Sequence, residues 1–210
     1  MQPAVTESLT RELFVEWAER GYAAISLERV AQRAGVGKAA LYRRWPSKLA
    51  MVVDRLEAVG IAPEPLPDTG ALASDVRAML AQLRRLLRHP LVGRILPDLH
   101  AEMPRNPELA AAVRGRLQVE RRRRGGELFT RAVTRGELPP DTDLELLSDA
   151  VAALLYWRLI VTRGRADDAY LDTLTAFILT ARSTTCPSAS PSSAPCSPSR
   201  PRCRPARPRT

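Results

Sequence analysis

One run of twenty residues, Arg29 to Lys48, limits the possible folds of this chain more than any other stretch. It reads RVAQRAGVGKAALYRRWPSK and contains two short helical patterns separated by AGVG. Gly35 suits the bend between them because glycine tolerates positive φ. Two helices of about two turns joined by a glycine-containing bend form a helix-turn-helix. The stretch therefore predicts this motif, with Pro46 ending its second helix.

The second helix of the motif, at residues 38 to 45, has one apolar side and one basic side. Leu41 lies three to four residues from both Lys38 and Trp45, so we expect it to point inward. In this motif the second helix enters the DNA major groove, where cations neutralise phosphates and small side chains allow close approach. The pattern predicts that the outward residues contact DNA: Lys38, Ala39, Ala40, Tyr42 and Arg43.

Two readings of this surface stay open. Tyr42 is either a phosphate contact or an ordinary core tyrosine, and its basic neighbours favour the first. Lys48 stands beside the start of the next helix, where Ser47 leaves a free helix N-terminus that offers an anion site.

The chain from residue 7 to residue 182 is almost continuously helical in pattern, and no stretch alternates as a β-strand does. The proline-rich APEPLPDTG, at 62–70, marks a boundary between two parts. We therefore predict an all-α fold of about nine helices. An N-terminal three-helix DNA-binding domain should precede a larger helical ligand-binding and dimerisation domain. The predicted divisions are 1–61, with the start of a linker helix at 47–60, then 68–182, and a tail at 183–210.

The tail has an unusual composition. It carries five of the arginines behind the net charge of +9, no acidic residue, and all three cysteines, Cys186, Cys196 and Cys203. Its content of serine, proline and arginine leaves almost no large apolar side chain to bury, which predicts disorder. A basic tail offers nonspecific contact with nucleic acid or an acidic membrane, whereas the simpler interpretation is a solvated appendage.

Little in the sequence points to catalysis, a metal or a membrane. The cysteine spacings match no zinc pattern, and His89 and His100 are the only histidines. The sequence has no glycine-rich phosphate loop and no catalytic pair of carboxylates, so we expect no catalytic residue, no metal site and no cofactor. The N-terminus lacks the pattern of a signal peptide, and the longest apolar run, AVAALLYW, is far shorter than the ~18 residues of a membrane span. We therefore expect a cytoplasmic protein with no membrane partner.

The helical pattern near residues 150–161 is apolar on all faces, with Arg158 as its only charge. Such a helix must be buried all round, which in a small domain requires its own core on one side and a partner on the other. Together with the last helix it fits a four-helix interface between two copies of the chain. The expected interface residues are Val151, Leu155, Arg158, Tyr170, Leu174, Phe177 and Ile178. Two-fold symmetry then predicts a palindromic operator in double-stranded DNA.

About forty residues, ELFVEWAERGYAAISLERVAQRAGVGKAALYRRWPSKLAMV, resemble the N-terminal domain of tetracycline-repressor-type (TetR-type) transcriptional regulators. The shared features are an aromatic-x-x-x-G-Y run at 17–22, Ser26, A-x-x-A-G-V at 31–36, K-x-x-L-Y at 38–42 and P-S-K at 46–48. The part from DTGAL to FILTAR is similar, more weakly, to a ligand-binding domain of the same family.

The resemblance implies roles for individual positions in the DNA-binding domain. The positions that usually hold phosphates are matched by Ser26, Lys38, Tyr42 and Lys48. The tip and exposed face of the recognition helix are matched by Gly37, Ala39, Ala40 and Arg43. Gly37 departs from the family pattern, because a serine or threonine cap is usual there.

The resemblance also implies a cavity for a small apolar or amphipathic effector in the larger domain. Its expected walls are Leu83, Leu87, Leu96, Leu99, His100, Met103, Phe129, Leu147, Leu154 and Trp157. A satisfied buried histidine is the alternative for His100. Effector binding would tilt the fourth helix and change the separation of the two recognition helices.

These features together predict a homodimeric, ligand-responsive transcriptional repressor, and not an enzyme. One alternative is a helical small-molecule carrier or enzyme with a coincidental helix-turn-helix, which would need titratable groups converging in the larger domain. Another is a sequence-neutral architectural protein that binds DNA through its basic tail.

Overall fold

The computed structural model describes residues 3–60 and 65–181, and every regular element within these ranges is helical. The predicted tail at 183–210 and its cysteines lie outside the described residues. In chain order the elements are α1 (Pro3–Arg20), α2 (Leu27–Arg33), α3 (Lys38–Arg44), α4 (Lys48–Gly60), α5 (Leu72–Leu87), α6 (Pro90–Glu102), α7 (Pro107–Ala112), the π-helix η1 (Val113–Gln118), α8 (Val119–Thr134), α9 (Leu144–Tyr156), the π-helix η2 (Trp157–Val161) and α10 (Asp168–Ala181).

The predicted all-α fold class is confirmed, with ten α-helices in the described ranges. Helices α7, η1 and α8 follow one another without a break and form one continuous rod. Counted as one, this rod brings the ten α-helices to the nine expected from the sequence.

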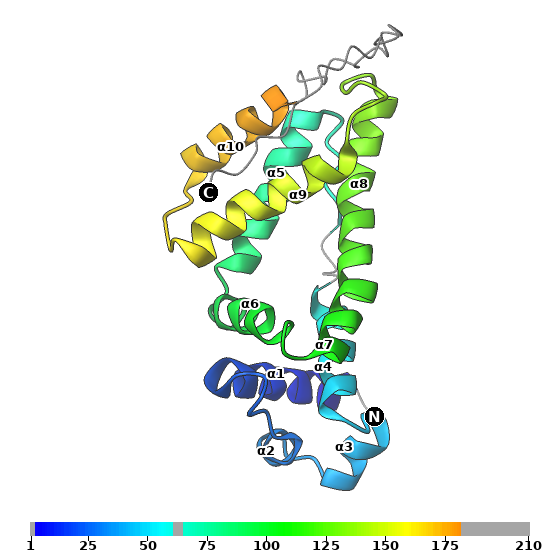
Figure 1. The fold of residues 1–210 in the computed structure, drawn as a ribbon, viewed down its shortest axis with the longest axis vertical. Helices are drawn as coiled ribbons and strands as arrows, with labels where there is room; N and C mark the ends of the chain where they lie inside the picture. Colours follow the sequence, from blue (N-terminus) through cyan, green and yellow to red (C-terminus); the bar gives the residue numbers. More distant parts are fainter. Residues whose placement is uncertain (1–2, 61–64, 182–210) are drawn as a thin grey trace, which may run out of the picture.

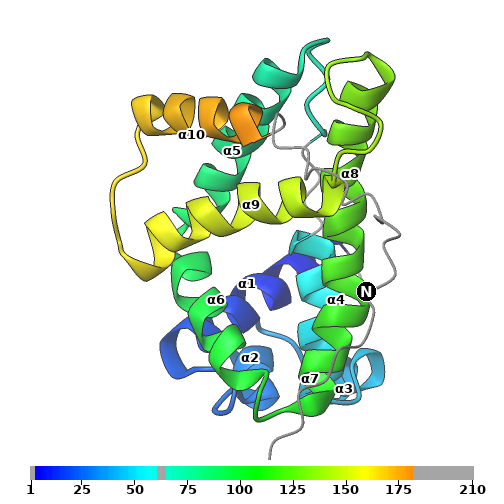
Figure 2. The same cartoon turned by 45° about the horizontal axis from the view of Figure 1, so that its top comes forward.

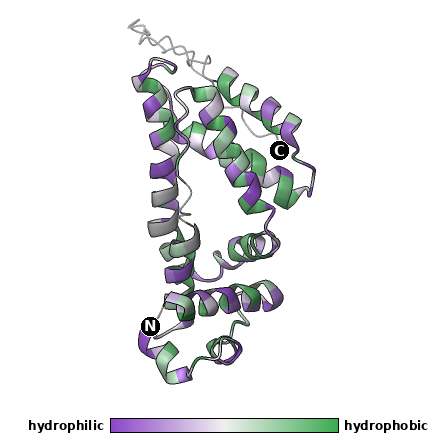
Figure 3. Ribbon diagram, turned by 180° about the vertical axis from the view of Figure 1, so that it is seen from behind, coloured by the Kyte–Doolittle hydropathy of each residue, from purple (hydrophilic) through white to green (hydrophobic). Residues whose placement is uncertain are grey.

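The helices form two groups at opposite ends of an elongated molecule (Figure 1). Helices α2 and α3 occupy one end, and α5, α8, α9 and α10 gather at the other. Helices α1, α4, α6 and α7 lie between them, and α9 crosses beside α8 and α5 when the molecule is tilted (Figure 2). Figure 3 shows that α8 is hydrophilic over much of its surface, whereas its neighbours are richer in apolar residues.

Local sequence signals set the starts of individual helices. The side chain of Ser26 accepts a hydrogen bond from the backbone amide of Arg29, and Asn106 accepts one from Leu109. Each bond satisfies an amide that the first turn of a helix leaves without an intrahelical partner. Gly35 has φ of +67°, which supplies the bend between α2 and α3.

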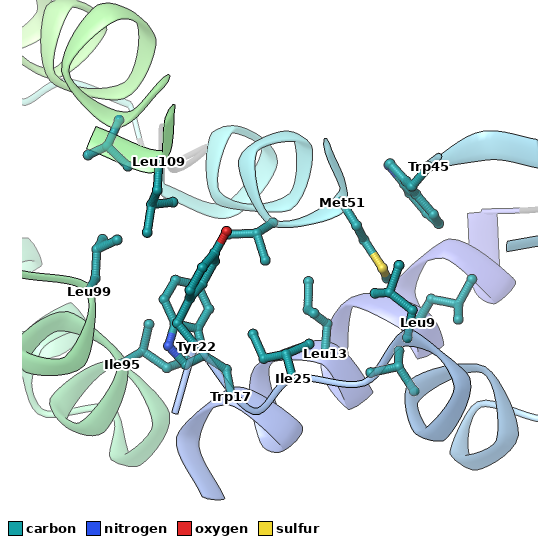
Figure 4. Close-up of a cluster of buried hydrophobic side chains, with 14 of the residues drawn as sticks. Leu9, Leu13, Trp17, Tyr22, Ile25, Trp45, Met51, Ile95, Leu99 and Leu109 are labelled. Carbon is teal, nitrogen blue, oxygen red and sulfur yellow. The ribbon is translucent and has the colours of Figure 1, made fainter. Parts of the chain in front are cut away.

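Two apolar clusters form the core, and they do not follow the predicted division at 61–68. The first cluster joins α1 to α4 with residues of α6 and α7, so that Ile95, Leu99 and Leu109 lie against Trp17 and Tyr22 (Figure 4). The second cluster is built from α5, α8, α9 and α10. Helices α6 and α7 therefore follow the linker in sequence but pack on the DNA-binding end of the molecule.

A buried carboxylate joins the start of α5 to the end of α8. Asp75 is fully buried and accepts hydrogen bonds from the amide of Thr69 at 2.6 Å and from its hydroxyl at 2.7 Å. Arg135 also bonds to Asp75 at 3.2 Å, and its guanidinium pairs with Glu137 at 2.5 Å. Burial acts to raise the pKa of Asp75, but the bonds from Thr69 and Arg135 outweigh burial and lower it.

We expect Asp75→Asn to lower the free energy of unfolding at pH 7 by about 2 kcal/mol, because the amide cannot replace the charge that Thr69 and Arg135 bind. A lowered folded-state pKa stabilises the fold above the unfolded pKa, near the ordinary value of 3.8, and this stability is lost as the pH falls through the folded pKa. The difference between variant and wild type should therefore shrink below about pH 4.

Urea denaturation at pH 7 and at pH 3 measures both effects. The exposed Asp149→Asn serves as the control, because its side chain is 57% exposed and lies 3.7 Å from Arg122. Equal unfolding free energies for Asp75→Asn and wild type at pH 7 would contradict the assignment.

Candidate nucleic-acid interface

Two seven-residue helices, α2 and α3, meet across the bend and form the outermost end of the molecule (Figure 1). Val30 and Leu41 are fully buried between them and α1. The amide of Val36 donates to the carbonyl of Ala31 at 2.9 Å, which closes the turn. The apolar sides of both helices thus face the core, and the predicted inward direction of Leu41 is confirmed.

The outward side of α3 carries the predicted DNA contacts. Lys38, Ala39 and Arg43 are exposed, whereas Ala40 and Tyr42 are half-buried. Arg43 makes no ion pair with any residue in the described part of the chain. Gly37 is the N-cap of α3 and supplies no side-chain bond, as its residue type requires. The helix that would enter a DNA groove therefore begins without a side-chain cap.

An acidic residue lies in the middle of this surface. Glu28, near the start of α2, accepts hydrogen bonds from Lys38 Nζ at 2.9 Å and from the Tyr42 hydroxyl at 2.9 Å. The hydroxyl of Ser26 donates to its second oxygen at 3.1 Å. The bond from Lys38 is the main cause that lowers the pKa of Glu28 to about 2, and the same pair raises the pKa of Lys38. Glu28 is therefore ionised throughout the neutral range.

Glu28 was not among the residues that the sequence identified. It lies two residues after the helix cap Ser26, where an acidic residue is ordinary because it complements the helix dipole. Its contacts with Lys38 and Tyr42 cross from one helix to the next, and no spacing rule within a helix reports them. Glu28 is separated from Lys38 by ten residues and from Tyr42 by fourteen, and neither separation indicates a contact.

Lys48, a predicted phosphate contact, already has partners within the chain. Its ammonium donates to the carbonyl of Tyr22 at 2.9 Å and to that of Ala23 at 3.0 Å. It also lies 4.5 Å from the centre of the Tyr22 ring. Burial lowers the pKa of Lys48. The side chain thus holds the loop between α1 and α2, which a role at the DNA surface does not require.

The aromatic residue at the end of α3 is a structural anchor. Trp45 is 3% exposed, and its indole nitrogen donates to Asp54 at 2.6 Å. The guanidinium of Arg44 lies 4.6 Å from the ring centre and also donates to the hydroxyl of Thr6. These contacts attach α3 to α4 and α1, so Arg44 belongs to the support of the recognition helix.

One carboxylate connects α6 to the DNA-binding helices. Asp98 accepts hydrogen bonds from the Trp17 indole at 2.6 Å and from the amide of Tyr22 at 2.8 Å. A side chain at Gly21 would meet Asp98 at 3.0 Å, so this approach favours glycine, whose φ is +79°. Two residues further along α6, His100 Nδ1 lies 2.9 Å from the hydroxyl of Tyr156 on α9. Helix α6 therefore contacts both ends of the molecule.

The structure distributes the predicted effector residues over both cores. Leu87, Phe129 and Leu147 are buried in the second cluster, with Leu83 packed against it, whereas Leu99 and Met103 are buried in the first. Leu96 packs against both clusters, and His100, Leu154 and Trp157 are exposed. The predicted burial of His100 is therefore wrong, and its ring reaches Tyr156 at the surface.

A shallow crevice with about 170 Å³ of empty space, open solvent included, lies elsewhere, between α4 and the α7–η1 rod. The space inside it that a water-sized molecule can occupy is close to zero, whereas small-molecule sites offer roughly 300 Å³ or more. Its lining residues are Val53, Leu56, Glu57, Ala112 and Val113. None of them is an expected wall of the effector cavity.

The predicted dimer residues fall on two different sides of α9 and α10. The buried ones, at 0 to 6% exposure, are Val151, Leu155, Leu174 and Ile178, and they pack in the chain's own second cluster. Phe177 is 59% exposed, and Arg158 instead donates to the carbonyl of Arg165 at 2.9 Å and stacks on Tyr170. The four buried residues therefore belong to the core of one chain. The sequence did not reveal this, because a helix that is apolar on all faces does not show which face meets its own core.

The described residues contain no group of three histidine, cysteine, aspartate or glutamate side chains placed to bind a metal ion. No helix in the same ranges is long and apolar enough to cross a membrane.

Comparison with known families agrees with the geometry of this end of the molecule. Residues 10–54 match the family model described as bacterial regulatory proteins, tetR family. Residues 66–178, more than half of the chain, match the model described as tetracyclin repressor-like, C-terminal domain. The chain therefore belongs to the TetR family of helix-turn-helix transcriptional regulators, a family of DNA-binding proteins and not of enzymes.

Individual relatives cover most of the chain. The DNA-binding transcriptional repressor TetR of Mycobacteroides abscessus is 32% identical over 160 residues, which are 76% of this chain and 83% of that protein. The HTH-type transcriptional regulator YdeS of Bacillus subtilis is 28% identical over 153 residues, or 73% of this chain and 77% of the relative. The solved structure of the TetR family transcription regulator SCO0332 is 30% identical, has a TM-score of 0.64, and is matched over 84% of this chain and 97% of its own.

The two lysines of the chain should respond differently to the same substitution. Lys48→Met removes two hydrogen bonds to backbone carbonyls of the loop between α1 and α2, so we expect it to lower the free energy of unfolding by about 1 kcal/mol. Lys38→Met affects an exposed side chain and should leave stability almost unchanged. Thermal or urea unfolding of both variants measures this difference, and a Lys48→Met variant as stable as Lys38→Met would refute the structural role.

Proposed function

We propose that this regulator is a homodimeric repressor that binds a palindromic operator through α3 and is released by a small apolar or amphipathic effector. The observation that carries the proposal is the exposed basic side of α3 at the end of the molecule, presented by a helix-turn-helix whose apolar side is buried. Lys38 and Arg43 supply the cations, and the small side chains of Ala39 and Ala40 allow the helix backbone to approach base edges.

A second copy of the chain is supported by four large apolar side chains that are exposed on α9, η2 and α10. They are Leu154 at 36% exposure, Trp157 at 61%, Val161 at 49% and Phe177 at 59%. Large apolar groups that gather on a soluble protein mark interaction sites. Pairing along α9 and α10 would cover them and leave both recognition helices free. We therefore assign the proposed interface to these four residues. Phe177 is the one among them that the sequence analysis also expected at the interface.

An effector site in the larger domain is supported by the family and by the position of α6. Four of the expected cavity residues lie on α6 or at its end, close to where the two clusters join: Leu96, Leu99, His100 and Met103. An effector that separates α6 from α9 would act on the contact of His100 with Tyr156. Measuring the affinity for DNA in the presence of apolar and amphipathic compounds tests this part of the proposal.

Helix α6 also provides a route from such a site to DNA. Asp98 bonds to the indole of Trp17 and to the amide of Tyr22, so a shift of α6 changes the position of α1 and of the loop before α2. The family resemblance implied this role for α4. The bonds of Asp98 support a second connection through α6, and an effector shifts the equilibrium only if it binds the DNA-incompetent arrangement more tightly.

We expect Lys38→Ala to weaken binding to a duplex that carries the region upstream of the gene, because each chain loses one phosphate contact. The salt dependence should become shallower by about one unit of log K against log salt for each chain bound. Electrophoretic mobility shifts at several salt concentrations measure both quantities. Arg88→Ala, an exposed cation at the end of α5, is the matched control and should bind like wild type. Unchanged affinity and slope for Lys38→Ala would refute the interface.

We expect a chain with both Trp157→Glu and Phe177→Glu to remain folded and to sediment as a single chain at micromolar concentrations. Two carboxylates placed in an apolar contact would lose hydration without gaining partners. Val119→Glu changes a residue that is 59% exposed on α8, outside the proposed contact, and should leave assembly unchanged. Analytical ultracentrifugation distinguishes the outcomes, and a dimeric double variant would remove α9 and α10 from the interface.

A further inference from the structure

The carboxylate of Glu28 occupies the groups through which α3 is expected to bind phosphate. The ammonium of Lys38 and the hydroxyl of Tyr42 both bond to one of its oxygens at 2.9 Å, and the hydroxyl of Ser26 bonds to the other at 3.1 Å. Three donors from two helices thus converge on one anion. This arrangement is the one that a DNA phosphate would need from the same side chains.

The contact lies at the surface, where DNA can replace it. The side chain of Glu28 is 49% exposed and that of Lys38 is 64% exposed. Exposed ion pairs are weak because water screens them, so a phosphate can compete for the same ammonium. An ammonium has three donors and can shift toward a phosphate without first losing every bond to Glu28.

Glu28 lowers the net positive charge of the surface that meets DNA. While Lys38 is paired with Glu28, the pair contributes no net charge to the surface that meets DNA. Arg43 remains as an exposed cation on the same helix. When Lys38 turns toward a phosphate, the carboxylate stays within the interface and repels the DNA backbone.

We propose that Glu28 is an internal phosphate mimic, an affinity-limiting residue that competes with DNA for Lys38 and Tyr42. Its effect is independent of base sequence, because the groups it occupies contact the backbone of any duplex. Glu28 therefore weakens binding to all DNA, and operator binding depends correspondingly more on base contacts by the tip of α3. This inference rests on the proposed DNA interface and adds a residue that acts against it.

The test needs no knowledge of the operator. The probe is a random-sequence duplex of about 30 base pairs, long enough for two half-sites one helical turn apart. Affinity is measured by fluorescence anisotropy at several salt concentrations for wild type and for Glu28→Gln. We expect Glu28→Gln to bind about tenfold more tightly at low salt. The slope of log K against log salt should become steeper, because the interface of each chain loses one negative charge.

Two further variants separate charge from structure. Glu28→Asp keeps the carboxylate and should bind within about twofold of wild type. Glu127→Gln removes the same charge from an exposed pair with Arg123 on α8, away from α2 and α3, and should leave affinity unchanged. Thermal unfolding should be nearly the same for all three variants, because each change lies at the surface.

A double variant distinguishes failure of this inference from failure of the interface. In a Lys38→Ala background, Glu28→Gln should increase affinity much less than it does in wild type, because the principal partner is gone. If Lys38→Ala alone leaves duplex binding unchanged, the proposed interface is wrong. If Lys38→Ala weakens binding but Glu28→Gln does not strengthen it, or weakens it, Glu28 holds the donors in place and does not compete with DNA.

Discussion

The short helices that meet DNA depend on a core that they share with the rest of the chain. A helix of seven residues is too short to be stable alone in water. Helices α2 and α3 are stable here because Val30 and Leu41 are fully buried against α1, and because Trp45 attaches the end of α3 to α4. The same core extends through Trp17 and Tyr22 to α6 and α7. The position of the recognition helix is consequently coupled to the larger domain by direct packing.

Signals within a single helix made much of this fold predictable. The caps at Ser26 and Asn106, the glycine at the bend and the inward direction of Leu41 all follow from neighbours within four residues along the chain. Contacts between different helices could not be predicted from neighbouring residues in this way. The bonds of Lys48 to two carbonyls and the salt bridge of Glu28 with Lys38 depend on how separate helices are placed, and an exposed charge looks the same in sequence with or without such a partner.

The apolar helix α9 shows the limit most clearly. Its composition predicts burial on all sides, but Val151 and Leu155 are buried within one chain whereas Leu154 and Trp157 are exposed. These residues lie within two turns, so hydropathy alone cannot decide which side meets a partner. The division of the core is a similar case. A proline-rich linker marks where the chain crosses between parts, but it does not report that α6 and α7 fold back on the first cluster.

The π-helical segment η1 solves a problem of alignment in the rod formed with α7 and α8. Leu109 and Val113 are buried in the first cluster, and Leu128 and Ala132, each nineteen residues later, are buried in the second. At about 100° per residue, nineteen residues of regular α-helix would end about 100° out of phase. A π-turn accommodates roughly one additional residue and so cancels this rotation. The buried residues near the two ends of the rod therefore lie on the same face of it, although they belong to two separate cores.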